Sequence, residues 1–376
     1  MKTSENVIVE QVIGPVSVIV PTYQEAENIA DLVGRIEAVR DKHDLELDLL
    51  ILDDPSDDGT DRIVADLAKP WVRLISRSGE RGLSYAVVDG LAAASGDRLV
   101  VMDADLSHPP EAIPSMLAAL DDSTVDFVIG SRYVPGASTD EAWGFLRWVN
   151  SKIATWLARP FTRAKDPMAG FFAMRRQTFE SAETLNPIGY KIGLELLVKC
   201  RCRKVAEIPI HFANRVNGLS KLNLTEQLRY LRHLKRLADY KYGTFSHIIQ
   251  FGAIGAAGTA VNVVTLALLL AAGMFDRLAV ALAIGVAMTH NFFLNRWITF
   301  SHAKHASIPG QYLRFVATCL LGAVISYSVT VWLWSQVAFF ADWKPIAAVM
   351  GVLAGMFFNF AGSKLWIFKK QGPATQ

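Results

Sequence analysis

Four long apolar stretches follow Tyr240, and they constrain the fold of this chain more than any other feature. Each stretch is about 20 residues or longer, which is enough for an α-helix to cross the hydrocarbon core of a bilayer. Each carries few charged residues, and buried helices of soluble proteins are rarely so long and so uniformly apolar. We therefore predict four transmembrane helices, at residues 247–272, 278–299, 312–340 and 343–368.

Basic residues are distributed unevenly around these predicted spans. Arg296, Lys304 and Arg314 lie around the connection between the second and third spans. The connections on the other side carry only Arg277 and Lys344, each close to an acidic residue. Connections rich in Lys and Arg stay in the cytoplasm, and no signal peptide is visible. We expect an integral, multi-pass membrane protein with both termini and the N-terminal region in the cytoplasm.

The membrane part contains a weak internal repeat. The segment that begins at Asn291 is similar to the segment that begins at Asn359. Earlier in the chain, in the span before each segment, a Phe is followed by a Gly seven residues after it. This pattern predicts two helical hairpins related by duplication. Asparagine side chains are costly in lipid, so we expect them to face other helices or lipid headgroups. Contact between helices is the simpler interpretation, and contact with a lipid phosphate stays open.

Before Tyr240, short apolar runs alternate with amphipathic segments. Such alternation predicts a mostly parallel sheet with helices on both faces, and ligands of these folds bind beyond the carboxyl ends of the strands. We therefore predict an α/β domain at residues 1–242 and an all-α membrane domain at 243–376. The expected strands are Val16–Val20, Leu47–Leu52, Val72–Ile75, Arg98–Met102 and Phe127–Ile129, and the expected helices include Glu25–Val39, Gly59–Leu67 and Leu83–Ala94.

The bulk composition excludes some classes of protein. The net charge of +2 gives no reason to expect a nucleic-acid partner. Three cysteines, Cys200, Cys202 and Cys319, are too few for a disulfide framework and have the wrong spacing for a zinc site. The sequence contains neither GxGxxG nor GxxxxGK[ST], which argues against a Rossmann dehydrogenase and a P-loop NTPase.

Acidic residues follow two of the predicted strands. Asp103 and Asp105 come directly after the run that ends at Met102. Two carboxylates one residue apart can hold Mg²⁺ or Mn²⁺ and leave positions for a diphosphate. Asp53 follows the run that ends at Leu52, where a carboxylate can accept hydrogen bonds from a nucleobase or a ribose. Neither pattern is specific alone, because acids at strand ends also form polar loops and helix caps.

Taken in order, the motifs resemble those of family 2 glycosyltransferases, and most closely the dolichol-phosphate mannose synthase branch. The resemblance covers residues 15–242, and residues 245–370 are similar to the GtrA-like four-helix membrane domain. It implies a GT-A fold. The matching motifs are Pro21-x-Tyr23-x-Glu25, Asp53-Asp-x-Ser-x-Asp-Gly-Thr60, Arg81-Gly-Leu83, Asp103-Ala-Asp-Leu-Ser-His-Pro-Pro110 and Ser131-Arg-Tyr133.

The resemblance also implies roles for individual residues. The nucleoside would contact Pro21, Tyr23, Glu25 and Asp53. The metal, Mg²⁺ or Mn²⁺, would be bound by Asp103, Asp105 and Ser107, where Ser107 stands in place of a more common Gln. The acceptor phosphate would contact Arg132, Arg147 and Ser151. The donor diphosphate would contact Arg215, in a segment that also contains Lys221. Ala169 replaces the usual Ser of the segment from Asp166 to Phe171, so no hydroxyl role is expected there.

The reaction implied by this resemblance is an inverting transfer of a sugar from a nucleotide-sugar to dolichyl or polyprenyl phosphate. A phosphate monoester is already anionic at neutral pH, so the reaction needs positioning and charge stabilisation rather than a catalytic base. GDP-mannose is the leading donor, and UDP-glucose or another nucleotide-sugar stays open. A processive polysaccharide synthase is disfavoured because no Gln-x-x-Arg-Trp motif occurs. A non-catalytic carrier of lipid-linked sugars is disfavoured because both Asp103 and Asp105 are present.

Two basic amphipathic segments, at residues 143–163 and 222–242, are expected to lie against the bilayer. The first carries Trp148 and Trp156 beside Arg147 and Lys152. Basic amphipathic helices with aromatic side chains lie in the headgroup plane. The second segment carries a leucine stripe, which we expect to contact lipid although such stripes often belong to a protein core. The stripe consists of Leu224, Leu228, Leu231 and Leu234.

Overall fold

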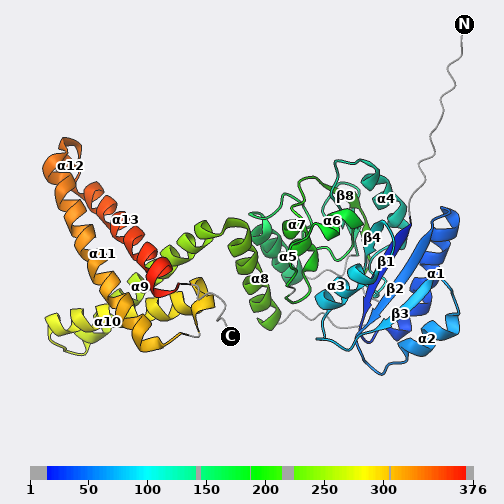
Figure 1. The fold of residues 1–376 in the computed structure, drawn as a ribbon, viewed down its shortest axis with the longest axis horizontal. Coiled ribbons are helices and arrows are strands. Elements are labelled where there is room, and N and C mark those ends of the chain that lie inside the picture. The colour runs from blue at the N-terminus through cyan, green and yellow to red at the C-terminus, as the bar shows by residue number, and fades with distance from the viewer. Residues whose placement is uncertain (1–14, 141–144, 187, 214–223, 305, 370–376) are drawn as a thin grey trace, which may run out of the picture. The chain divides into compact units, whose positions relative to one another are not determined.

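The computed structural model describes residues 15–140, 145–186, 188–213, 224–304 and 306–369 (Figure 1). The chain divides into two compact units, Met1–Lys241 and Tyr242–Gln376.

The first unit is built on a seven-stranded sheet in the order β3-β2-β1-β4-β7-β5-β8. Neighbouring strands are parallel except at β7, which is antiparallel to both β4 and β5. All five strands predicted from the sequence are present, so the predicted fold class is confirmed. The bounds are β1 Val16–Thr22, β2 Leu47–Asp53, β3 Val72–Ser76, β4 Arg98–Val101, β5 Phe127–Ser131, β7 Phe172–Arg175 and β8 Val205–Pro209; β6 (Ser138–Thr139) and β9 (His211–Phe212) form a separate pair.

Helices cover both faces of this sheet because its strands are apolar on both sides. Alternate residues of β1 divide between two cores: Val18 packs with α1 and α4, whereas Ile19 packs with α3 and α7. Fully buried, continuously apolar strands of this kind are typical of sheets sandwiched between helices. The helices of this unit are α1 Ala26–Lys42, α2 Thr60–Leu67, α3 Leu83–Ala93, α4 Ile113–Asp121, α5 Phe145–Ala158, α6 Arg176–Glu180, α7 Ile192–Lys199 and α8 Leu224–Tyr242, with a short 3₁₀ turn at Pro110–Ala112.

The two predicted amphipathic segments form α5 and α8, with two corrections. Helix α5 ends at Ala158 rather than at residue 163, because Pro160 disfavours helical geometry in the residue before it. The leucine stripe of α8 is divided: Leu234 is buried with Leu237 against α5 and α7, while Leu228 and Leu231 are exposed. Burial of Leu234 in the protein core leaves Leu228 and Leu231 as the described residues of the stripe that are exposed. Residues 143–144 and 222–223 lie outside the described residues.

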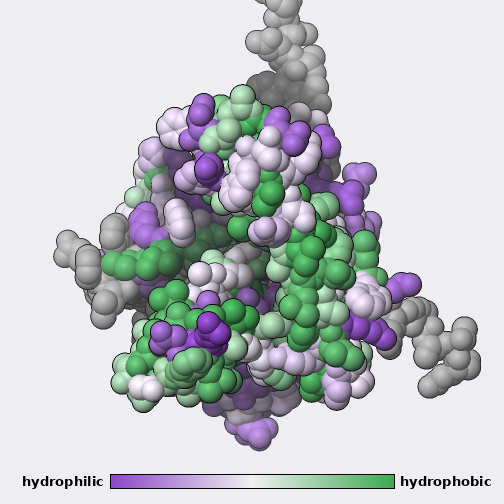
Figure 2. All heavy atoms as spheres, turned by 90° about the vertical axis from the view of Figure 1, so that its left-hand side faces the viewer, coloured by the Kyte–Doolittle hydropathy of each residue, from purple (hydrophilic) through white to green (hydrophobic). Residues whose placement is uncertain are grey.

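Among its described residues, the second unit contains four helices that are long and apolar enough to cross a membrane. Their exposed surface is rich in large hydrophobic side chains, which form long tracts on the face shown in Figure 2. The third helix ends at Gln336, four residues before the predicted end, because Val337 is extended. The helices are α9 Thr244–Ala271, α10 Asp276–Leu294, α11 Ile308–Gln336 and α13 Lys344–Gly362, with a short α12 at Ala338–Asp342, a 3₁₀ turn at Ser301–Ala303, and π-helical turns at Asn295–Thr299 and Ser363–Ile367 that continue α10 and α13.

The internal repeat appears as two hairpins with the same close contact. In the α9–α10 hairpin, the Asn291 side chain lies directly over Gly258, where an added Cβ would come within 2.1 Å of its Oδ1. In the α11–α13 hairpin, Asn359 lies over Gly322 with the same 2.1 Å approach. Glycine therefore lets the two helices of each hairpin approach closely, as is common in membranes. This arrangement supports the interpretation that these asparagines contact helices.

The contacts between the two hairpins are also repeated. Phe292 packs on Phe315 with ring centroids 5.6 Å apart, and the equivalent Phe360 packs on Phe251 at 5.7 Å. These rings belong to one buried phenylalanine cluster drawn from both hairpins. The second unit is therefore a duplicated hairpin held together by equivalent contacts.

Candidate active site

The predicted site residues gather at one edge of the sheet. The carboxyl ends of β1, β2, β4 and β5 lie at this edge because those strands run in the same direction. Strand β7 runs the opposite way, so the loop that precedes Phe172 reaches the same edge. Thr22, Asp53, Asp103 and Arg132 each end or follow one of these strands. This is the edge at which α/β folds bind their ligands.

The acidic pair Asp103 and Asp105 lies just beyond the end of β4. Asp105 is buried, and its Oδ1 accepts hydrogen bonds from the Ser107 hydroxyl and, at 3.1 Å, from the Ser107 backbone amide. Asp103 is half-buried. Ser107, predicted as a metal ligand, thus orients the Asp105 carboxylate through two donors.

His108 holds the backbone of the acidic pair in place. Its Nδ1 accepts a hydrogen bond from the Asp103 amide at 3.0 Å, which leaves the proton of the neutral ring on Nε2. The ring is buried and stacks on Phe171 with centroids 5.3 Å apart. Burial lowers the pKa of His108, which favours this neutral form. No role for His108 was predicted from the sequence, although its place in the motif after Asp105 could have suggested one.

Gly170 leaves room for the Asp103 carboxylate. A Cβ at this position would lie 3.1 Å from Oδ2 and 3.2 Å from Oδ1 of Asp103. Among the described residues, no group of three or more His, Cys, Asp or Glu side chains is arranged to hold a metal. Two carboxylates nevertheless fit Mg²⁺ or Mn²⁺, because such ions usually take their other ligands from water and substrate phosphates.

Arg132 follows β5 and is held by a buried carboxylate. Asp166 accepts hydrogen bonds from Nε of Arg132 at 2.7 Å, from Nη2 at 2.8 Å and from its backbone amide at 3.0 Å. Asp166 is fully buried, so this bidentate pair fixes the guanidinium plane. Asp166 takes the side-on edge of the guanidinium, formed by Nε and Nη2, whereas Nη1 and Nη2 form its end-on edge.

The other residues predicted to bind the acceptor are only partly within the described structure. The Ser151 hydroxyl lies 2.7 Å from the Tyr133 hydroxyl, and Tyr133 directly follows Arg132, so α5 is joined to this edge of the sheet. Arg147 belongs to α5, but its side chain lies outside the described residues, as do Arg215 and Lys221.

The predicted nucleoside contacts lie at the ends of β1 and β2. Asp53 is buried and accepts a hydrogen bond from the Thr22 hydroxyl at 3.0 Å; burial raises the pKa of its carboxyl group, and Asp58 adds to this effect. The Tyr23 ring lies 3.4 Å from the Arg81 guanidinium carbon. Pro21 is a buried residue of β1 and directly precedes Thr22 and Tyr23 in the sequence.

Two acidic residues near these contacts have structural partners. Glu25 accepts a hydrogen bond from the Asn28 side chain at 2.7 Å. Asp58 accepts backbone amides from Ala26 and Thr60, both at 3.1 Å, and so joins the first turns of α1 and α2. Asp58 therefore caps helices, as the sequence suggested for part of this acidic motif.

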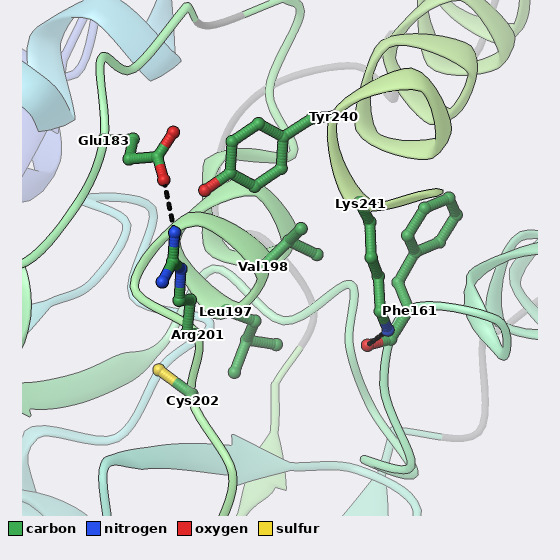
Figure 3. Close-up of a pocket in the computed structure, with 8 residues that line it drawn as sticks. All are labelled: Phe161, Glu183, Leu197, Val198, Arg201, Cys202, Tyr240 and Lys241. Atoms are coloured by element: carbon green, nitrogen blue, oxygen red, sulfur yellow. Dashed lines mark hydrogen bonds and ion pairs between the residues drawn. The ribbon is translucent and has the colours of Figure 1, made fainter. Parts of the chain in front are cut away.

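A separate cavity of about 640 Å³ lies between the C-terminal ends of α7 and α8. Figure 3 shows the ion pair between Arg201 and Glu183, 2.6 Å long, beside the Tyr240 ring. Cys202 also lines this cavity and precedes β8 in the chain, so the cavity lies toward the amino end of that strand. None of the predicted site residues contributes to it.

Each of the two units matches a known protein family. Residues 17–182 match the profile of glycosyl transferase family 2, and residues 250–368 match the GtrA/DPMS transmembrane domain. A dolichol-phosphate mannosyltransferase of Pyrococcus furiosus is 41% identical over 319 residues, which cover 84% of this chain and 89% of that protein. This chain belongs to the dolichol-phosphate mannosyltransferase family. It is therefore a glycosyltransferase with a membrane domain, and the resemblance described from the sequence is confirmed.

Another relative and a solved structure cover smaller shares of this chain. The dolichol-phosphate mannosyltransferase of Saccharomyces cerevisiae is 40% identical over 243 residues, 62% of this chain and 90% of that protein. Glucosyl-3-phosphoglycerate synthase from Mycobacterium tuberculosis, solved with Mn²⁺, UDP-glucose and glycerol 3-phosphate, is 19% identical with a TM-score of 0.45, covering 61% of this chain and 80% of that one.

Proposed function

We propose that this enzyme transfers mannose from GDP-mannose to dolichyl or another polyprenyl phosphate, at the cytoplasmic face of the membrane. The observation that carries the proposal is the arrangement of one sheet edge, where the acidic pair Asp103 and Asp105 and the fixed guanidinium of Arg132 follow strands β4 and β5, separated only by β7. The 41% identity with a dolichol-phosphate mannosyltransferase supports the choice of sugar and acceptor.

The residues at this edge of the sheet would each have a separate role in the reaction. Asp53 and Tyr23 would hold the nucleoside, and Asp103 and Asp105 would hold Mg²⁺ or Mn²⁺ beside the diphosphate. When bound, the cation supplies positive charge that stabilises the leaving diphosphate. Ser107 keeps the Asp105 carboxylate oriented, and His108 keeps the backbone of Asp103 in place.

Arg132 would bind the lipid phosphate and direct one of its oxygens at the anomeric carbon. The bond between that carbon and the diphosphate oxygen breaks as the new carbon–oxygen bond forms, so the configuration inverts. A phosphate monoester has a second pKa of about 6 and needs no base to remove a proton. His108 fits a reaction without a general base. Its pKa is lowered and its Nδ1 already accepts the Asp103 amide, so it holds the backbone rather than removes a proton. The main contribution of the protein is positioning.

The surface of α5 and α8 suits a lipid acceptor. Ile153 and Trp156 of α5 and Leu228 and Leu231 of α8 are exposed, with Trp156 at 72%. The two helices are joined by a hydrogen bond from the Tyr230 hydroxyl to a carbonyl oxygen of α5. Exposed apolar side chains on basic helices are typical of surfaces that lie in the headgroup region. A lipid phosphate could then reach Arg132 while its isoprenoid chain stays in the bilayer.

The basic residues around the membrane helices favour a cytoplasmic site. Lys304 and Arg314 lie exposed near the turn between the second and third spans, whereas the opposite connections contain only Arg277 and Lys344. The connection rich in basic residues would be cytoplasmic, together with both termini.

The experiment that tests this proposal is a transfer assay with a panel of donors. Purified enzyme in detergent is incubated with Mn²⁺, polyprenyl phosphate and radiolabelled GDP-mannose, UDP-glucose or other nucleotide-sugars. We expect label to enter the lipid fraction from GDP-mannose alone, and to be lost in the Asp105→Asn variant. Transfer from another donor would replace mannose in the proposal, and no transfer from any donor would refute the reaction.

A further inference from the structure

Glu207 of β8 makes an unusual pair of contacts with the loop that precedes β7. Its Oε2 accepts the backbone amide of Lys165 at 2.7 Å, and its Oε1 accepts the backbone amide of Asp166 at 3.0 Å. One carboxylate thus binds two consecutive amides of the loop. Hydrogen bonds to a charged acceptor are stronger than those between neutral groups, so this contact fixes the loop at residues 165–166.

The same loop carries the carboxylate that grips Arg132. Asp166 bonds the Nε, Nη2 and backbone amide of Arg132, and it is fully buried. Arg132 follows β5, which is the direct neighbour of β8 in the sheet. The contacts therefore form a continuous series from Glu207 through the backbone of Asp166 to the guanidinium. A shift of the loop would move the Asp166 carboxylate and turn the plane of the guanidinium.

We propose that Glu207 is a positioning residue for the acceptor phosphate. It holds the backbone of residues 165–166 so that Asp166 presents the end-on edge of Arg132 to the lipid phosphate. This inference rests on the proposed function, in which Arg132 binds that phosphate. Both oxygens of the Glu207 carboxylate accept loop amides, so we expect its effect to reach the acceptor through Asp166 and Arg132 and to leave the nucleotide-sugar unaffected.

The other end of the same two strands offers a matched control. There Asp126, which precedes β5, accepts the backbone amides of Arg203 at 2.7 Å and Lys204 at 3.1 Å with its Oδ2. This is the same kind of contact, one carboxylate on two consecutive amides, about 20 Å from the active edge by the rise of a strand. A purely structural role predicts similar consequences for the loss of either carboxylate.

The test compares Glu207→Gln with Asp126→Ala in the full chain, because both amides bond the same Asp126 oxygen and an asparagine at position 126 could still accept them. For each variant, KM is measured for polyprenyl phosphate at saturating donor and for the nucleotide-sugar at saturating acceptor, together with kcat and the melting temperature. The amide of Glu207→Gln keeps one acceptor oxygen and turns an NH₂ group toward a backbone N–H. We expect the acceptor KM to rise about tenfold, the effect of one unsatisfied backbone amide, with the donor KM unchanged within about twofold. Asp126→Ala removes the acceptor of both amides and is expected to lower the melting temperature and leave both KM values unchanged.

Two results would overturn the inference. One is an equal rise of both KM values in Glu207→Gln, and the other is the same rise of the acceptor KM in Asp126→Ala. If Glu207→Gln does not fold, Glu207→Asp replaces it, since this variant keeps both oxygens on a shorter side chain, and the same selective rise is expected. A wild-type enzyme that transfers no sugar refutes the proposed function and this inference with it, whereas an active wild type with unselective variants refutes the inference alone.

Discussion

Replacing Gly258 with alanine should destabilise the membrane unit by overpacking one hairpin. The added Cβ would lie 2.1 Å from Oδ1 and 2.4 Å from Nδ2 of Asn291. Carbon and oxygen atoms in contact prefer about 3.5 Å, so the amide must retreat by roughly 1 Å or the helices must separate. Overpacking of this kind costs about 1–3 kcal/mol.

Gly255 is a matched control for this variant. It lies in the same helix, one turn before Gly258, and an added Cβ there would have nothing within 4 Å. Gly255→Ala is therefore expected to change the stability by less than about 0.5 kcal/mol. The double variant Gly258→Ala/Asn291→Ala removes the clashing amide and should recover most of the loss, which a double-mutant cycle measures as a favourable coupling.

Stability can be followed through Cys319, the single cysteine of the membrane unit. This side chain packs against the phenylalanine cluster shared by both hairpins, so its labelling by a thiol reagent reports the opening of that cluster. The labelling rate is measured over a titration with sodium dodecyl sulfate, with the peptide that contains Cys319 identified by mass spectrometry. If Gly258→Ala opens no more easily than Gly255→Ala, or if Asn291→Ala gives no rescue, the account of close helix packing is wrong.

Three further predictions concern the first unit. Gly170→Ala should raise the Mn²⁺ concentration needed for half-maximal transfer several-fold, because its Cβ would press on both oxygens of Asp103 and small misplacements in a site reduce activity. Burial lowers the pKa of His233 in the folded protein, whereas in the unfolded chain this side chain keeps its ordinary pKa of about 6.5. The unfolded chain therefore binds more protons than the folded protein as the pH falls below about 6.5. The melting temperature should fall as the pH drops from 7 to 5.5, and should fall less in His233→Gln. Trp156→Ala should raise the acceptor KM without lowering the melting temperature, because this side chain is 72% exposed and packs on little protein.

Each of these predictions has an outcome that contradicts it. An unchanged Mn²⁺ requirement in Gly170→Ala would show that Asp103 moves freely or binds no cation. Equal pH dependence in wild type and His233→Gln would assign the acid sensitivity to other groups. A lower melting temperature in Trp156→Ala, with an unchanged acceptor KM, would place this ring in the protein core.

The sequence predicted the parts of the molecule that local patterns specify. The apolar runs of the parallel strands and the long membrane helices are continuous in the chain, so their positions could be found to within a few residues. The place of Asp103 and Asp105 followed from the strand before them. The repeat of Asn291 and Asn359 was visible as similarity, although the contact of each asparagine with a repeated glycine became evident only in the structure.

Contacts between distant segments could not be predicted in the same way. Arg132 was expected to bind phosphate, but its partner Asp166 lies 34 residues away and is brought to it by the antiparallel strand β7. Glu207 is a further 41 residues along the chain. The burial of Leu234 depends on the packing of α8 against α5 and α7, which a helical stripe alone does not specify.

The linkage and anomeric configuration of the reaction product decide whether this enzyme transfers mannose to the lipid phosphate by inversion. Enzyme, GDP-mannose and polyprenyl phosphate are incubated together, and the lipid product is analysed by ³¹P and ¹H NMR. The account predicts a phosphodiester that joins mannose to the lipid, with the anomeric configuration inverted relative to the donor. A product with retained configuration would contradict the single displacement by a phosphate oxygen at this site, and mannose attached anywhere other than the lipid phosphate would contradict the role of Arg132.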